Sequence, residues 1–167
     1  MTDVVVVTDL GRTIAFTFED LLKYHGPGSP AGVAVAFKAL QRAFAVLSPD
    51  APPERRSVTV HTPFRGPGAR DGFEAVTRAV TDGRYVVDRG LVRSDLGGLR
   101  EDFVFEIGVG GPTVTVLLRD GFVDDEFIDL ARTEGRTGAQ ERRLDVLKAI
   151  LAQRVMATAA ADVYELA

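Results

Sequence analysis

A glycine- and proline-rich bend that runs directly into a long apolar helix constrains this chain more than any other feature. The bend spans residues 24–32 (Tyr-His-Gly-Pro-Gly-Ser-Pro-Ala-Gly), and the predicted helix spans residues 30–47. Apolar side chains recur in the helix every three or four positions, at Val33, Phe37, Leu40, Phe44 and Leu47. This spacing indicates one buried stripe. We therefore expect the helix to pack on the core and to hold the bend beside it.

The rest of the chain alternates short strands with helices. Strands are expected at residues 4–7, 13–18, 57–62, 85–87, 103–109 and 113–118, and helices at 18–24, 70–81, 120–132 and 138–160. Glycine-containing turns join the first two and the last two strands as hairpins. The prolines and glycines of residues 63–68 predict a loop. Residues 89–102 are polar and contain glycines, so we expect them to form an irregular excursion from the regular elements. The alanine-rich segment 157–161 at the end of the last helix is expected to be exposed or to pair with another protomer. The length of the chain and the lack of a convincing linker predict one domain over residues 1–167 that contains both strands and helices.

Composition excludes several classes of function. A net charge of −4, with arginines interleaved among acids, argues against binding to a nucleic-acid backbone. The absence of cysteine excludes disulfides, thiolate metal sites and cysteine nucleophiles. No apolar run approaches the roughly 18 residues of a membrane span, and the first residues do not resemble a signal peptide. We expect a cytoplasmic protein that takes a small-molecule substrate and binds neither nucleic acid nor membrane.

His25, one of only two histidines, lies in the bend. One interpretation makes it a general acid or base, or a metal ligand, held on a constrained turn. The other makes it a structural residue that hydrogen-bonds the turn backbone. Gly28 allows close backbone approach, and the helix start at Pro30 offers unpaired amides to an anion. Ser29 has the position of an N-cap, and a serine that caps a helix can face a ligand as well.

Residues 61–71 repeat this design, with a strand end, a glycine–proline loop and a helix start. If the two loops pack together, they frame one pocket that contains both His25 and His61. Arg65 is suited to bind a carboxylate or phosphate. Asp71 either orients a histidine or forms a capping box with Glu74, which in turn has the spacing of a helical ion pair with Arg78. Two histidines and a carboxylate also leave open a metal site at His25 and His61.

The segment from Tyr24 to Ala34 resembles the opening motif of the formylmethanofuran dehydrogenase E-component family, in which an aromatic residue and His-Gly precede Cys-Pro and a helix of small and apolar residues. Residues 71–76, Asp-Gly-Phe-Glu-Ala-Val, are similar in character to a later helix of that family. The resemblance covers about residues 16–132. It implies an α+β domain with a mixed sheet packed against helices, like the catalytic domain of glyceraldehyde-3-phosphate dehydrogenases, together with a homodimer and zinc held through histidine and cysteine.

The chain departs from that family at three points. Ser29 replaces the family's cysteine, Pro27 replaces a frequent second histidine, and the cysteine-rich tail is missing. The resemblance therefore applies to His25 and to the fold, but the set of zinc ligands found in the family is incomplete in this chain. No cofactor is required, and a divalent metal such as zinc stays an open alternative.

Two functions follow from these residues. In the first, the protein is a lyase, isomerase or hydrolase that uses His25 for proton transfer on an anionic or carbonyl-containing substrate. In the second, it is a non-catalytic protein that binds a small molecule. The candidate catalytic residues are His25, Ser29, His61 and Asp71, and the candidate substrate-binding residues are Tyr24, Gly28, Arg65, Glu74 and Arg78.

Overall fold

The computed structural model describes residues 3–167 and confirms an α+β architecture with a mixed five-stranded sheet. The strand order is β4–β3–β5–β6–β7, in which β3 and β4 are parallel and all other neighbours are antiparallel. Strands β1 and β2 form a separate hairpin. The strands are β1 (Val5–Asp9), β2 (Arg12–Phe16), β3 (Val58–Thr62), β4 (Tyr85–Val87), β5 (Val104–Val109), β6 (Thr113–Leu118) and β7 (Tyr164–Leu166).

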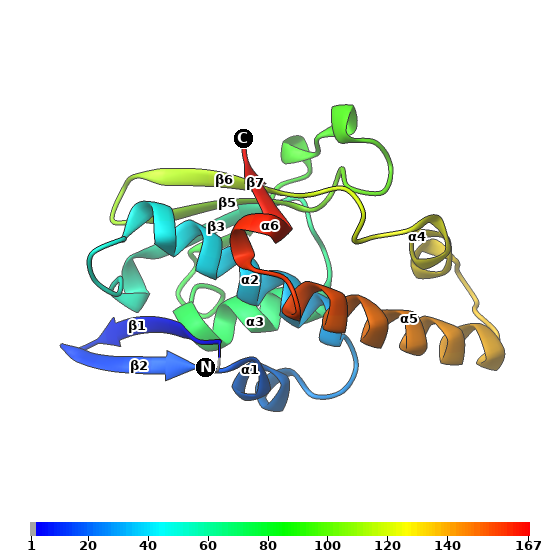
Figure 1. Ribbon diagram of the computed structural model, residues 1–167, viewed down its shortest axis with the longest axis horizontal. Coiled ribbons are helices and arrows are strands. Elements are labelled where there is room, and N and C mark those ends of the chain that lie inside the picture. Colours follow the sequence, from blue (N-terminus) through cyan, green and yellow to red (C-terminus); the bar gives the residue numbers. More distant parts are fainter. Residues whose placement is uncertain (1–2) are drawn as a thin grey trace.

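Helices fill the space between the sheet and the hairpin (Figure 1). Helices α2 and α3 form a middle layer under one face of the sheet, and α1 packs on this layer from the side away from the sheet. Helices α4 and α5 extend to one side of the molecule. The helices are α1 (Phe18–His25), α2 (Pro30–Leu47), α3 (Pro67–Thr77), α4 (Asp125–Arg132), α5 (Gly138–Met156) and α6 (Ala160–Val163).

Helix α2 is the centre of the core. The predicted stripe is confirmed for Val33, Phe37, Leu40 and Phe44, while Leu47 is only partly buried. All alanines of the helix except Ala45 are buried as well. Contacts with α3, α5, β5 and β6 surround the helix, which explains why one stripe does not describe it. The expectation that no apolar run has the length of a membrane span needs correction, because α2 is long and apolar enough by composition. In the fold it serves as a core helix.

Helix α3 begins earlier than predicted. The loop expected at residues 63–68 is wrong at its end, because Pro67 occupies the first helical position and Gly66 caps the helix. The N–H of the first helical residue has no acceptor within the helix, so proline, which lacks an N–H, loses no hydrogen bond at that position and favours a helix start. The predicted 70–81 helix ends at Thr77, where Arg78 turns into the left-handed region at φ 59°.

The C-terminal part also differs from the prediction. The 138–160 helix ends at Met156, and the exposed residues after it lead into α6 and β7. Strand β7 then pairs antiparallel with β6 at the sheet edge. The sequence does not predict this strand, because three residues carry too little periodicity to identify it.

Candidate functional site

The N-terminal ends of α2 and α3 meet in the middle layer. A Cβ atom added to Gly32 would lie 2.8 Å from the backbone nitrogen of Ala69, and one added to Gly68 would collide with the carbonyl oxygen of Ser29. Only glycine permits this approach, because any side chain would push the two helices apart. The prediction that the two glycine–proline loops pack together is therefore confirmed.

Four backbone amides at these helix ends have no hydrogen-bond partner among residues 3–167: Ala31, Gly32, Gly68 and Ala69. Each helix has proline in its first position, so these are the first amides that the helices present. Ser29 is the N-cap of α2, as predicted, but its hydroxyl makes no capping bond. Unpaired amides and the helix dipole both favour a negative charge at this place.

A cavity of about 350 Å³ opens beside the two helix ends. Ser29, Gly32 and Gly68 form part of its wall, and the other walls come from the segment before β5 and from α4 and α5. Most of the remaining wall is apolar: Ala31, Phe64, Leu99, Phe103, Phe127, Ile128, Ala131 and Leu144. A volume of this size with apolar walls and a few polar groups is typical of a small-molecule site.

The charged side chains around the cavity are mostly cationic. Arg65 makes no ion pair or hydrogen bond within the described residues, although it lines the cavity. Lys148 also lines it, and its Nζ donates to the carbonyl oxygen of Gly28 at 3.2 Å. The other charges are engaged, since Arg132, Arg136 and Asp102 form ion pairs with Glu101, Glu141 and Arg89. A free cation beside unpaired amides suits an anionic group.

His25 and Asp71 form a close pair next to this cavity. His25 is the last residue of α1, and its Nδ1 lies 2.7 Å from Oδ2 of Asp71 on α3. The His25 side chain is only 8% exposed, and its Nε2 is buried without a hydrogen-bond partner in the described part of the chain. Of the two roles foreseen for Asp71, the structure supports orienting a histidine. The capping box with Glu74 does not form, because α3 begins at Pro67.

The bend separates His25 from the cavity. His25 is not among the lining residues, whereas the neighbouring Ser29 is. A Cβ atom added to Gly28 would lie 3.9 Å from His25 Nε2, so Gly28 lies close to that nitrogen. The structure thus places His25 one loop thickness behind the cavity wall.

His61 lies elsewhere in the molecule. Side chains alternate along β3, so Val58 and Val60 face the helical layer while His61 faces the opposite side. Its side chain is 44% exposed and lies 3.9 Å from Glu106 on β5. His25 is the last residue of α1, and α1 packs on the side of α2 and α3 away from the sheet (Figure 1). The expectation of one pocket with both histidines is therefore wrong.

A metal site shared by His25 and His61 is therefore wrong as well. Among residues 3–167 no three histidine, aspartate or glutamate side chains gather closely enough to hold a metal ion. Asp71 engages one ring nitrogen of His25, and Ser29 stands where the family resemblance implies a thiolate. These residues do not fit the zinc site that the resemblance implies.

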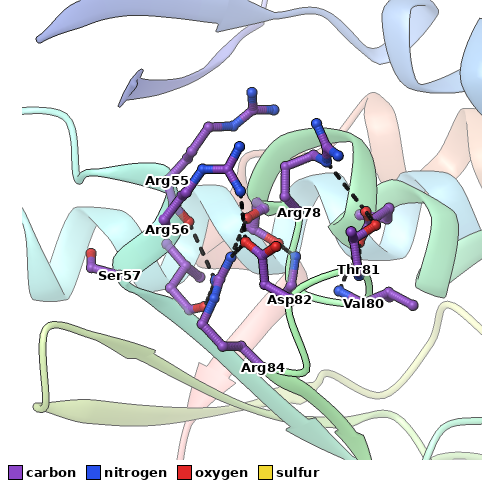
Figure 2. Close-up of polar contacts among 12 residues, drawn as sticks. Arg55, Arg56, Ser57, Arg78, Val80, Thr81, Asp82 and Arg84 are labelled. Atoms are coloured by element: carbon purple, nitrogen blue, oxygen red, sulfur yellow. Dashed lines mark hydrogen bonds and ion pairs between the residues drawn. The ribbon is translucent and has the colours of Figure 1, made fainter. Parts of the chain in front are cut away.

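Three predicted substrate-binding residues, Tyr24, Glu74 and Arg78, line a separate, open depression. The Glu74 carboxylate accepts hydrogen bonds from the amides of Val80 and Thr81 and contacts Arg78 at 3.5 Å (Figure 2). It thereby holds the turn that follows α3. Tyr24 is 57% exposed at the rim. The structure does not bring these three residues together with Arg65.

An arginine cluster that was not foreseen from the sequence stabilises the C-terminal end of α3 (Figure 2). Arg55 donates to the carbonyls of Ala75 and Val76, and Arg84 donates to the carbonyl of Thr77 at 2.9 Å. Asp82 accepts from Arg84 and Arg56, and these bonds lower the pKa of its carboxyl group, with the Arg84 bond as the main cause. Cations at a helix C-terminus compensate its unpaired carbonyls, so this cluster is structural.

The distal cavity wall, including Leu99, Ile128 and Lys148, was not foreseen either. No local signal marks these residues, because only the fold brings α4 and α5 to the bend. No family model and no curated protein matches the chain. The resemblance to the E component of formylmethanofuran dehydrogenase, and the fold that it implies, stay predictions from the sequence.

Proposed function

We propose that this protein binds a small molecule that combines an anionic group with an apolar body. The observation that carries the proposal is the meeting of two helix N-termini at an apolar-walled cavity, where the unpartnered amides of Ala31, Gly32 and Gly68 belong to lining residues and Arg65 is a lining residue as well. The amides and the guanidinium suit a carboxylate or phosphate. The aromatic and aliphatic wall suits a ring or a branched chain.

The size of each effect indicates how the two parts share the binding. A negative group at one helix N-terminus gains about 0.3–1 kcal/mol, and the gain weakens in salt. Burial of a small ring against the wall contributes about 25 cal/mol for each Å² of apolar surface removed from water. The apolar body therefore supplies most of the affinity, while the amides and Arg65 select the charge.

Titration calorimetry with phenylacetate and its neutral analogue phenylacetamide tests this proposal. Phenylacetate should bind at a single site and phenylacetamide should bind much more weakly, because only the acid brings the negative charge that the helix dipoles and Arg65 favour. Replacing Arg65 by glutamine should weaken phenylacetate binding about threefold to tenfold. Arg12, an exposed residue of β2, provides the control as Arg12→Gln, which should bind like the unaltered protein. Equal binding of acid and amide, or no saturable binding, would contradict the proposal.

A second candidate function is acid–base catalysis by His25. The observation that favours it is the Nδ1 contact to Asp71 at 2.7 Å, combined with an Nε2 that has no partner among the described residues. If Nδ1 carries the proton and donates it to Asp71, Nε2 presents its lone pair as a base. Asp71 then stabilises the imidazolium that forms when Nε2 takes a proton. We propose that Nε2 removes a proton from a carbon next to a carbonyl group and returns a proton to the product.

Hydrogen exchange on a carbonyl acid tests this step. The protein should accelerate the exchange of the C3 hydrogens of 2-oxo-4-phenylbutyrate with D₂O, as followed by proton NMR. His25→Gln should lose about 10²-fold or more of that acceleration, whereas His61→Gln, on the far face of the sheet, should keep it. Exchange no faster than in buffer, or full activity of His25→Gln, would eliminate catalysis and leave binding as the function. The homodimer and the cytoplasmic location stay predictions.

A further inference from the structure

One side-chain contact links the cavity to the bend that covers His25. Lys148 lines the cavity from α5, and its Nζ donates to the carbonyl oxygen of Gly28 at 3.2 Å. Among the described residues this is the only side-chain hydrogen bond that residues 26–29 of the bend receive. The contact joins positions 120 residues apart in sequence. The hydrogen bond therefore connects α5, which forms one wall of the cavity, to the bend.

The bend controls access to the unpartnered nitrogen. His25 Nε2 is fully buried, and Gly28 of the bend lies close to it. In the structure as it stands, a molecule in the cavity meets Ser29 and not the imidazole. Contact between a bound molecule and Nε2 requires that Gly28 move.

The other restraints on the bend are at its two ends, where the Gly26 amide donates to the carbonyl of Leu22 at 2.6 Å and the Ser29 carbonyl accepts from Val33 at 3.4 Å. Gly26 adopts φ 90°, a backbone region that glycine enters without strain, and a Cβ there would meet no atom within 4 Å. The Ser29 hydroxyl makes no capping bond that would fix the other end. Between its two ends, Pro27 and Gly28 make no hydrogen bond within the described residues other than the one from Lys148.

We propose that Lys148 is a positioning residue that latches the bend over His25 and releases it when an anion enters the cavity. This inference rests on the proposed anion-binding function. An ammonium group bonds a carboxylate or phosphate more strongly than a neutral carbonyl. An anion held by the helix ends and Arg65 draws Lys148 Nζ away from Gly28. The freed bend then moves, and Nε2 faces the bound molecule.

Chemical modification of His25 tests the latch without any ligand. Diethyl pyrocarbonate acylates accessible imidazole nitrogens, and the His61→Gln background leaves His25 as the single histidine. Lys148→Met, which keeps an apolar stem, should raise the rate of His25 acylation about threefold to tenfold. Lys148→Arg should restore the slow rate, because it can still donate to Gly28. Arg142→Met, at an exposed position of the same helix, should leave the rate unchanged.

The carbonyl carbon of Gly28 reports the second half of the inference. Loss of the hydrogen bond shifts its ¹³C NMR signal upfield, and this shift should occur both in Lys148→Met and in the unaltered protein saturated with phenylacetate. Methyl signals of Leu99 and Ile128 report occupation of the cavity independently. If the methyl signals respond and Gly28 does not, the latch is wrong and the binding function stands.

If the methyl signals do not respond to phenylacetate, the proposed function fails instead. Even then, the rate of His25 acylation in Lys148→Met tests whether Lys148 holds the bend, because that measurement uses no ligand. An unchanged rate in that variant would overturn the latch, whatever the cavity binds.

Discussion

Lys38 is a lysine buried in the core. It lies in the middle of α2 with 2% of its surface exposed, and its Nζ is 2.7 Å from Oδ2 of Asp3. Burying an ammonium group costs free energy unless a partner compensates it. Asp3 therefore stabilises the fold from a position near the start of the chain.

Replacing Asp3 by asparagine should lower the free energy of unfolding by about 1 kcal/mol, because it leaves the Lys38 charge without its carboxylate. The Asp3 side chain is 51% exposed, so solvent screening keeps the loss from being larger. Urea denaturation measures the change. In a Lys38→Met background the same Asp3→Asn substitution should have no effect. A loss of equal size in both backgrounds would show that the ion pair is not its cause.

At the scale of single residues, the sequence located part of the site and misplaced the rest. His25, Ser29 and Arg65 were singled out by their glycine–proline surroundings, and all three lie at or next to the cavity. His61 was misplaced although its alternation with Val60 could be read from the sequence. Alternation shows that two side chains face opposite ways, but only the burial of Val60 shows which side is the core.

At the scale of elements, the contact between α2 and α3 determines the site. Gly32 and Gly68 let the two helix ends approach until their backbones touch, and the unpaired amides then gather at one place. The geometry of the anion site therefore depends on two missing side chains as much as on the residues present.

Gly32→Ala should destabilise the protein by about 1–3 kcal/mol, because the new methyl group would lie 2.8 Å from the Ala69 nitrogen. In an unobstructed helix the same change stabilises by about 0.5–1 kcal/mol, so the direction of the effect is diagnostic. Chemical denaturation of Gly32→Ala beside Gly98→Ala gives the comparison. Gly98 has open space around its Cβ position, so Gly98→Ala should be close to neutral. A stabilised Gly32→Ala would contradict the close approach.

Elements with a strong local signal could be predicted, and elements that depend on distant partners could not. The hairpin of β5 and β6 turns at Gly110 and Gly111, both with positive φ, and α5 begins with a capping box of Thr137 and Gln140, a local pattern that is visible in the sequence. Strand β7 has only three residues and exists because β6 offers an edge. The start of α3 differs from the prediction because Pro67 does not interrupt the helix but occupies its first position, where proline is favoured.

At the scale of the whole molecule, β7 ties the end of the chain to the core. Tyr164 on β7 is fully buried, and its hydroxyl donates to the carbonyl of Val35 on α2 at 2.9 Å. Burial raises its pKa well above the usual value. Burial also raises the pKa of Tyr85 to about 12, and its hydroxyl has no partner in the described residues. The fold therefore holds these two phenols in the neutral form.

This burial predicts the alkaline stability of the protein. The folded state keeps protons on Tyr85 and Tyr164 at pH values where the unfolded chain, with phenol pKa values near about 10, has lost them. Stability is thus fully present below a pH of about 10 and falls as the pH rises from about 10 through 12. Urea denaturation at a series of pH values from about 8 to 11 measures the decline, and Tyr85→Phe should make it shallower. A free energy of unfolding that stays constant across that alkaline range would contradict the burial of both phenols.

The central claim is that the unpaired amides at the ends of α2 and α3 bind the charged group of a small molecule. An NMR titration of ¹⁵N-labelled protein with phenylacetate tests it most directly. The amide signals of Ala31, Gly32 and Gly68, which line the cavity, should shift downfield and saturate together, and phenylacetamide should not reproduce the shifts. If these three amides do not respond while others do, or if acid and amide give the same shifts, the helix ends are not the anion site.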